Sequence, residues 1–166
     1  MKNNILLSGA KGRMGQAITK IASDHECEII APIDQGDDPE AQIDNCDVVI
    51  DFSLADATLP LAKVAAKAGK PMVIGTTGHE KSVKKEIIKT MASIPVVWAG
   101  NFSTGVNLLF YLTQEVSRIL DSKSNFDPEV IEMHHRLKKD APSGTADRLL
   151  EIIKNSRNAK DSDICH

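Results

Sequence analysis

The sequence predicts an α/β protein with a doubly wound parallel sheet, followed by the start of a smaller α+β domain. Short apolar runs alternate with segments of helical spacing through residues 1–103, and a glycine-rich turn at residues 9–15 joins the first run to the first helical segment. The runs are continuous rather than alternating, as in strands that helices bury on both faces. Beyond residue 103 this alternation changes. We therefore expect a dinucleotide-binding domain at residues 1–103 and a substrate domain at 104–166.

Each expected element has a local reason. Apolar runs predict strands at residues 4–8, 27–34, 46–52, 71–75 and 95–99, and a further strand at 127–133. Apolar positions three and four residues apart predict helices at 13–23, 56–68, 79–92, 104–120 and 144–155. The residues available for a buried face on the helix at 104–120 are Val106, Leu109, Phe110, Leu112, Thr113 and Val116.

Composition excludes several classes of function. The 166 residues are 42% hydrophobic and carry a net charge of −3, without the basic stripe that a nucleic-acid partner requires. No apolar run approaches the roughly 18 residues of a membrane helix, and the N-terminus lacks a signal-peptide pattern, so a cytoplasmic protein is expected. Cys27, Cys46 and Cys165 form no CxxC pair, and we predict neither a disulfide framework nor a metal site.

The turn at residues 9–15 predicts a phosphate-binding loop, which makes the nucleotide domain Rossmann-like. Gly9 permits a tight turn, Gly12 lets the backbone approach a pyrophosphate, and Gly15 lets the helix pack closely on the sheet. The helix N-terminus then offers N–H groups to the phosphates. The alternative is a strand–helix turn that binds nothing. The expected cofactor contacts here are Gly9, Ala10, Lys11, Gly12, Arg13 and Met14.

Asp34 ends the second expected strand about twenty residues after the loop. A carboxylate at that spacing is placed to accept hydrogen bonds from the adenosine ribose. Because it would repel a 2′-phosphate, NADH is the preferred cofactor, although Lys11 and Arg13 leave NADPH possible. The alternative is a solvated loop acid.

The ends of the fourth and fifth strands predict the nicotinamide site, since ligands of parallel sheets lie at the carboxyl ends of strands. The residues expected there are Gly75, Thr76, Thr77, Ala99, Gly100, Asn101 and Phe102. The alternative for the two threonines is helix N-capping, which is compatible with the first role. Asn107, inside an otherwise apolar helix, is either a satisfied buried amide or a supporting group of the site.

The stretch at residues 132–146, EMHHRLKKDAPSGTA, combines groups that can carry protons with a small-residue helix start. His134 and Lys138 are suitable proton donors for a reduction by hydride. Ser143, Gly144 and Thr145 open a helix whose N–H groups can bind an anion. On a strand His134 and His135 would point to opposite faces. A metal site built on them lacks further ligands at suitable spacing, apart from Glu132 and Asp140.

This stretch resembles the signature of the dihydrodipicolinate (4-hydroxy-tetrahydrodipicolinate) reductase family. GAKGRMG, VIDFS, VIGTTG and NFSTGVN precede it in the family's order, so the resemblance covers nearly all of residues 4–155. It implies NAD(P)H-dependent reduction of 4-hydroxy-tetrahydrodipicolinate in lysine and diaminopimelate biosynthesis. It further implies His134 as the acid/base group, Lys138 as proton donor, His135 as a substrate contact, and Gly144 and Thr145 as ligands of a substrate carboxylate.

Family members are longer, and the portion after residue 166 normally completes the substrate domain's sheet and its tetramer surface. We therefore expect a fragment, a truncated product or an unusually short form, with an incomplete second domain and poor stability or self-association. The resemblance implies a homo-oligomer, which is a tetramer in the family and depends there on the missing portion. One alternative function is a cofactor-binding module without turnover. Another is a nicotinamide dehydrogenase of amino or keto acids, such as an aspartate or homoserine dehydrogenase, against which residues 132–146 argue.

Overall fold

The structure, a computed structural model, describes residues 2–120, 125–134, 136 and 142–160. The chain divides into two compact units, Met1–Gly100 and Asn101–His166. Within the described residues, no helix is long and apolar enough to cross a membrane.

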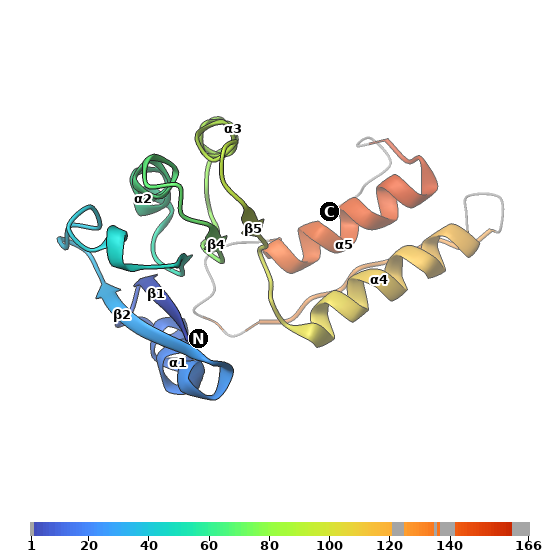
Figure 1. The fold of residues 1–166 in the computed structure, drawn as a ribbon. Coiled ribbons are helices and arrows are strands. Elements are labelled where there is room, and N and C mark those ends of the chain that lie inside the picture. The colour runs from blue at the N-terminus through green and yellow to red at the C-terminus, as the bar shows by residue number, and fades with distance from the viewer. Residues whose placement is uncertain (1, 121–124, 135, 137–141, 161–166) are drawn as a thin grey trace. The chain divides into compact units, whose positions relative to one another are not determined.

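The first unit is a five-stranded, all-parallel sheet in the order β2-β1-β3-β4-β5, which confirms the predicted doubly wound α/β fold (Figure 1). Its strands are β1 (Asn3–Ser8), β2 (Cys27–Ile33), β3 (Val48–Asp51), β4 (Met72–Ile74) and β5 (Val96–Trp98). Its helices are α1 (Arg13–Ile21), α2 (Ala55–Lys67) and α3 (Lys81–Thr90), with short 3₁₀ turns η1 (Ala22–His25) and η2 (Ile43–Asn45). The chain passes from β1 outward to β2, then returns to the other side of β1 as β3. This reversal opens a crevice at the carboxyl ends of the central strands.

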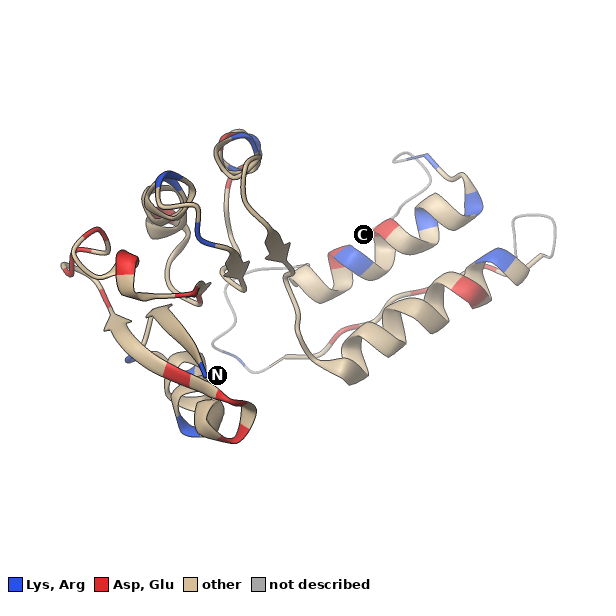
Figure 2. Ribbon diagram, in the orientation of Figure 1, with Lys and Arg blue, Asp and Glu red and all other residues tan. Residues whose placement is uncertain are grey.

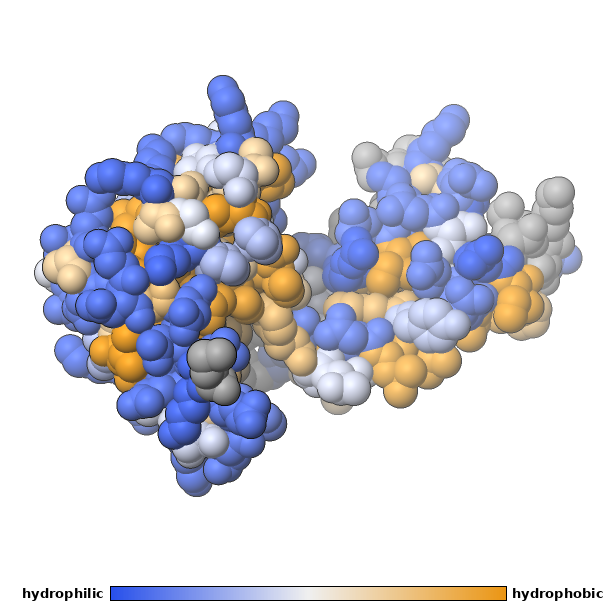
Figure 3. Space-filling model, in the orientation of Figure 1, coloured by the Kyte–Doolittle hydropathy of each residue, from blue (hydrophilic) through white to orange (hydrophobic). Residues whose placement is uncertain are grey.

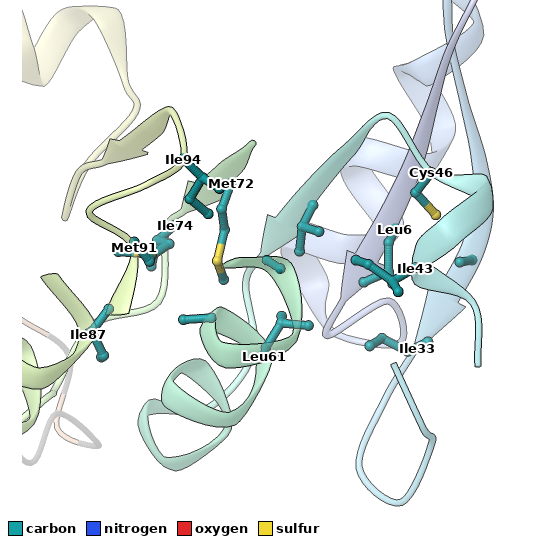
Figure 4. Packing of buried hydrophobic residues seen from close by; sticks show 14 residues of the cluster. Leu6, Ile33, Ile43, Cys46, Leu61, Met72, Ile74, Ile87, Met91 and Ile94 are labelled. Carbon is teal, nitrogen blue, oxygen red and sulfur yellow. The ribbon is translucent and has the colours of Figure 1, made fainter. Parts of the chain in front are cut away.

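The core of the first unit lies between the sheet and the helices α2 and α3 (Figure 4). Leu6, Val49 and Ile74 contribute from the strands and Ala62 and Ile87 from the helices, all with no exposed surface. Leu7, next in β1 and also fully buried, points to the opposite face because side chains alternate along a strand. Burial on both faces explains why the strands are continuous apolar runs.

The second unit contains two helices in its described part, α4 (Thr104–Ile119) and α5 (Gly144–Arg157), which pack side by side (Figure 1). The predicted strand at residues 127–133 is wrong. This segment forms no ladder, because a strand needs a neighbouring strand for its backbone hydrogen bonds and the described part of this unit offers none. Ile131 and Met133 are 83% and 90% exposed.

The predicted buried face of α4 is only partly right. Val106, Phe110 and Thr113 are half-buried as expected, but Leu109, Leu112 and Val116 are about half exposed. Ser117 is buried instead, since it continues the stripe of residues three and four apart that begins at Val106. The exposed apolar residues of α4 therefore form a second stripe, visible as orange atoms over this helix (Figure 3). We call this the outer stripe; it comprises Leu108, Leu109, Leu112, Val116 and Ile119.

Candidate functional site

The glycine turn between β1 and α1 is fixed by its own packing. Gly9 has φ +80°, and a Cβ placed there would lie 2.3 Å from the carbonyl oxygen of Phe52. A Cβ on Gly15 would lie 2.2 Å from the carbonyl oxygen of Gly9. The backbone N–H of Gly9 donates to Ile33 at 3.0 Å, which ties the turn to the end of β2. Side chains at Gly9 and Gly15 would therefore force the turn open.

The N-terminus of α1 suits an anionic ligand. Gly12 is the N-cap residue and has no side chain to bond the first N–H groups of the helix. These groups have no acceptor within an α-helix, and they lie at its positive dipole end. A Cβ on Gly12 would meet only the Gly9 carbonyl, at 3.1 Å, so a bulky group would enter space that a ligand could use. The turn thus fits a pyrophosphate.

Asp34 lies directly after β2, close to the strand end where the sequence places it, and contacts the glycine turn. Its Oδ2 accepts a hydrogen bond from the backbone N–H of Lys11 at 2.9 Å. Its own N–H donates to Oδ2 of Asp37 at 2.9 Å. These contacts fix the carboxylate beside the turn, with Oδ1 left for a ligand hydroxyl.

A cavity of about 480 Å³ lies at this edge of the sheet. Its lining includes Asp34, Asp37 and Asp56, and no lysine or arginine contributes to the described wall. Further acidic residues lie along β2 and in the loops beside it (Figure 2). The sequence predicted Gly9, Gly12 and Asp34 here, but missed the wall that residues 52–61 supply.

The loop after β3 is held by the buried carboxylate of Asp51. Its Oδ2 accepts from Thr58 Oγ1 at 2.7 Å, and its Oδ1 accepts from the N–H of Ser53 at 3.0 Å. Thr76 joins this network: its Oγ1 accepts from the Ser53 N–H at 2.9 Å and donates to the Asp51 carbonyl at 3.3 Å. The Thr76 hydroxyl is therefore used within the protein, which leaves its backbone groups for a ligand.

The remaining predicted nicotinamide residues lie at the ends of β4 and β5. Thr77 is exposed, and neither threonine caps α3, whose N-cap residue is Glu80, so the capping alternative is wrong. In the second unit, the Asn107 amide donates to the carbonyls of Asn101 at 3.1 Å and Ser103 at 2.9 Å. Asn107 is exposed, so the expectation of a satisfied buried amide is wrong, and its two hydrogen bonds hold the 101–103 turn.

His79, which the sequence did not single out, is buried between α3 and β5. Its ring meets that of Trp98 edge to face at 5.2 Å. Neither ring nitrogen has a hydrogen-bond partner among the described residues. Burial lowers the pKa of His79, the Asp51 carboxylate opposes this shift, and Lys84 adds to it.

In the second unit the structure brings His134 and Ser143 together through Glu132. His134 Nε2 lies 2.7 Å from Oε2 of Glu132, and the Ser143 N–H donates to Oε1 at 2.8 Å. The hydrogen bonds from His134 and then from Ser143 lower the pKa of Glu132 to about 2. Sequence reasoning named Glu132 only as a possible metal ligand and did not give it this role, although its place two residues before His134 was a signal. His135 and Lys138 lie outside the described residues.

Ser143 is the N-cap residue of α5, and its Oγ accepts from the N–H of Ala146 at 3.1 Å. The N–H groups of Gly144 and Thr145 precede the first intrahelical bond and donate to no described residue. This leaves two adjacent donors at a positive helix end, the arrangement that a carboxylate needs. No three His, Cys, Asp or Glu residues of the described chain are grouped to hold a metal ion.

Comparison with known proteins identifies the family. A family model described as "Dihydrodipicolinate reductase, N-terminus" matches residues 3–102, and one described as "Dihydrodipicolinate reductase, C-terminus" matches residues 105–165. The chain belongs to the dihydrodipicolinate reductase family. The N-terminal domain of this family is a nucleotide-binding domain, which implies NAD(P) as the cofactor of the first unit.

Among curated relatives, the 4-hydroxy-tetrahydrodipicolinate reductase of Akkermansia muciniphila is 46% identical over 162 residues, which are 96% of this chain and 65% of the relative. That of Campylobacter jejuni is 41% identical over 151 residues, 90% of this chain and 61% of the relative. The chain thus spans less than two thirds of the length of these relatives.

A solved structure, "Dipicolinate bound Dihydrodipicolinate reductase from Paenisporosarcina sp. TG-14", matches all of this chain and 70% of its own with a TM-score of 0.77. At 24% sequence identity this likeness supports the fold of the dihydrodipicolinate reductases.

Proposed function

We propose that this chain provides the cofactor site and the proton-handling groups for reduction of 4-hydroxy-tetrahydrodipicolinate to tetrahydrodipicolinate by NAD(P)H. Its relatives are named 4-hydroxy-tetrahydrodipicolinate reductases, which supports the substrate. The observation that carries this proposal is the arrangement in the second unit. His134 is held by a carboxylate whose other oxygen bonds the N-cap of α5, so a proton carrier and an anion-binding helix end adjoin.

The first unit would bind the dinucleotide. The turn from Gly9 to Met14, with Ala10, Lys11, Gly12 and Arg13, would hold the pyrophosphate, and Asp34 Oδ1 would accept from a ribose hydroxyl. NADH is favoured over NADPH, because Asp34, Asp37 and Asp56 around the cavity repel a 2′-phosphate. Lys11 and Arg13 are the cations that would permit use of NADPH.

The nicotinamide, when bound, supplies a hydride. Ala99 and Gly100 at the end of β5 would leave room for the ring, and backbone groups at the ends of β4 and β5 would bond its carboxamide. The residues that we propose for this site are Gly75, Thr76, Thr77, Ala99, Gly100, Asn101 and Phe102. Residues 1–103 would thus form the cofactor domain and residues 104–166 the substrate domain.

The second domain would bind and protonate the substrate. In the overall reaction the substrate gains a hydride and a proton and loses water, so one group must deliver a proton as the hydride arrives. His134 and Lys138 would handle this proton. The substrate is a dicarboxylate, and the N–H groups of Gly144 and Thr145 would bind one carboxylate, with Ser143 and His135 as further contacts.

The deciding experiment follows NADH absorbance with this protein and enzymatically generated substrate, and repeats it with NADPH. Substrate-dependent loss of absorbance that His134→Asn lowers by about 10²–10⁴-fold supports the proposal. His25→Asn, a matched change at an exposed histidine of the first unit, should leave the rate unchanged. Tight binding of NADH without turnover would instead indicate a binding module. Absence of binding to either dinucleotide would contradict the cofactor assignment.

A further inference from the structure

Glu132 links its own segment, which also carries His134, to the N-terminus of α5. Its carboxylate contacts His134 two residues later and Ser143 eleven residues later. The side chains on either side, Ile131 and Met133, are almost fully exposed and contribute little packing. The position of this part of the chain therefore depends strongly on the two hydrogen bonds of Glu132.

The segment that carries Glu132 is also held at its other end by α5. Arg157, in the last turn of that helix, donates to the carbonyl of Phe126 at 2.6 Å and also to that of Leu120. The six residue-to-residue steps from Phe126 to Glu132 span roughly 20 Å when extended. The 14 residues of α5 span about 21 Å along the helix axis. The segment is thus drawn out along the full length of α5, with Arg157 at one end and Glu132 at the other.

The Glu132 contact also determines which nitrogen of His134 carries a proton. The hydrogen bonds from His134 and Ser143 keep the pKa of Glu132 at about 2, so at neutral pH its carboxylate is ionised and can only accept. The hydrogen between Oε2 and Nε2 must therefore belong to the imidazole. Nδ1 remains as the nitrogen that can exchange a proton with a ligand.

We propose that Glu132 is a positioning residue for the reductase reaction. It fixes the ring and the Nε2–H form of His134 and sets that ring at a constant place beside the N-terminus of α5. This inference rests on the proposed function for its catalytic meaning.

The charge of Glu132 is compatible with an anionic substrate. A lone carboxylate beside the α5 N-terminus would repel a substrate carboxylate. The hydrogen bonds that it accepts from His134 and Ser143 offset part of that repulsion. The N–H that it occupies is that of Ser143, so the donors of Gly144 and Thr145 remain for the substrate.

The test compares wild type, Glu132→Gln and the matched control Glu129→Gln, an exposed glutamate on the same segment. kcat and KM are measured with NADH and substrate, and ¹⁵N NMR of the histidine rings reports which nitrogen is protonated, with His134 assigned from its Asn variant.

We expect Glu132→Gln to lower kcat about tenfold or more with KM nearly unchanged, because an amide keeps the acceptor for Ser143 but not the charge beside His134. The His134 signals should lose their Nε2–H pattern, and Glu129→Gln should change neither readout.

The inference is overturned if Glu132→Gln retains the wild-type kcat and His134 spectrum, or if Glu129→Gln has an equal effect. A lower kcat with a lower unfolding temperature and an unaltered His134 spectrum also overturns it, since Glu132 would then be structural only. If the wild-type chain reduces no substrate, the proposed function fails. The His134 spectrum alone then decides whether Glu132 positions the ring.

Discussion

The aromatic ring of Phe52 lies directly against Gly75, so that a Cβ on Gly75 would be 2.1 Å from Phe52 Cε1. The carbonyl of the same phenylalanine lies against Gly9. One residue from the loop after β3 thus occupies the space that glycines leave at the ends of β1 and β4.

Replacing Gly75 with alanine should therefore destabilise the first unit by about 1–3 kcal/mol, the usual cost of overpacking. Urea unfolding measures the effect. Gly100→Ala is the control, because a Cβ there meets nothing closer than 3.9 Å. In a double-mutant cycle, Phe52→Ala should remove most of the cost of Gly75→Ala. Additive effects would show that the ring and the glycine do not compete for this space.

Asp34→Asn should weaken NADH binding about tenfold or more, because a charged acceptor is lost from the ribose site. It should weaken NADPH binding less, since the repulsion of a 2′-phosphate is lost at the same time. Titration calorimetry with both dinucleotides measures the two affinities. Asp24→Asn, at an exposed aspartate of η1, is the control. An unchanged NADH affinity in Asp34→Asn would remove Asp34 from the cofactor site.

His79 should make the first unit sensitive to acid. Burial lowers its folded-state pKa below the ordinary 6.5, so the unfolded chain takes up this proton more readily. Its effect on stability is therefore absent above pH about 6.5, and stability falls as the pH drops below that value. His79→Phe keeps an aromatic contact with Trp98 and should flatten the pH dependence of the urea midpoint. His25→Asn should leave it as in wild type, and an equally steep dependence in His79→Phe would contradict the prediction.

The outer stripe of α4 should promote self-association, because an apolar helix face exposed to water gains by burial against another copy. Replacing Leu112 and Val116 together with glutamine should shift the chain toward monomer in sedimentation measurements. Ile88→Gln, at a residue of α3 that is 61% exposed, is the control for general loss of surface hydrophobicity. A wild-type chain that stays monomeric at high concentration would rule out association through this stripe.

The parts that the sequence predicted well depend on local pattern. The spacing of Gly9 and Gly15 predicted a tight turn, and Asp34 follows it at the distance typical of this fold. In the structure the N–H of Lys11, within the turn, donates to Asp34. The strands of the first unit were found because burial on both faces makes them continuous apolar runs. Their ends differ by one or two residues, where hydrogen bonding between strands stops.

The parts that it missed depend on neighbours far along the chain. Residues 127–133 have a strand-like sequence, but a strand also requires a partner. The choice between Ser117 and Leu112 for the buried face of α4 depends on tertiary packing, in which α4 lies against α5. Glu132 gains its role from Ser143, and His79 from Trp98, through orientations that no spacing rule reports.

The drawn-out segment between Phe126 and Glu132 has a consequence for how this region can vary. Its side chains mostly face water, so replacements at Ile131 or Glu129 cost little, whereas its length is matched to α5. Adding one residue would introduce slack of about 3.3 Å, more than the length of a hydrogen bond, and deleting one would pull one of its two attachments apart. Pro128 suits this constraint because its fixed φ limits the ways in which the chain can shorten. Here the count of residues is constrained more tightly than their identity.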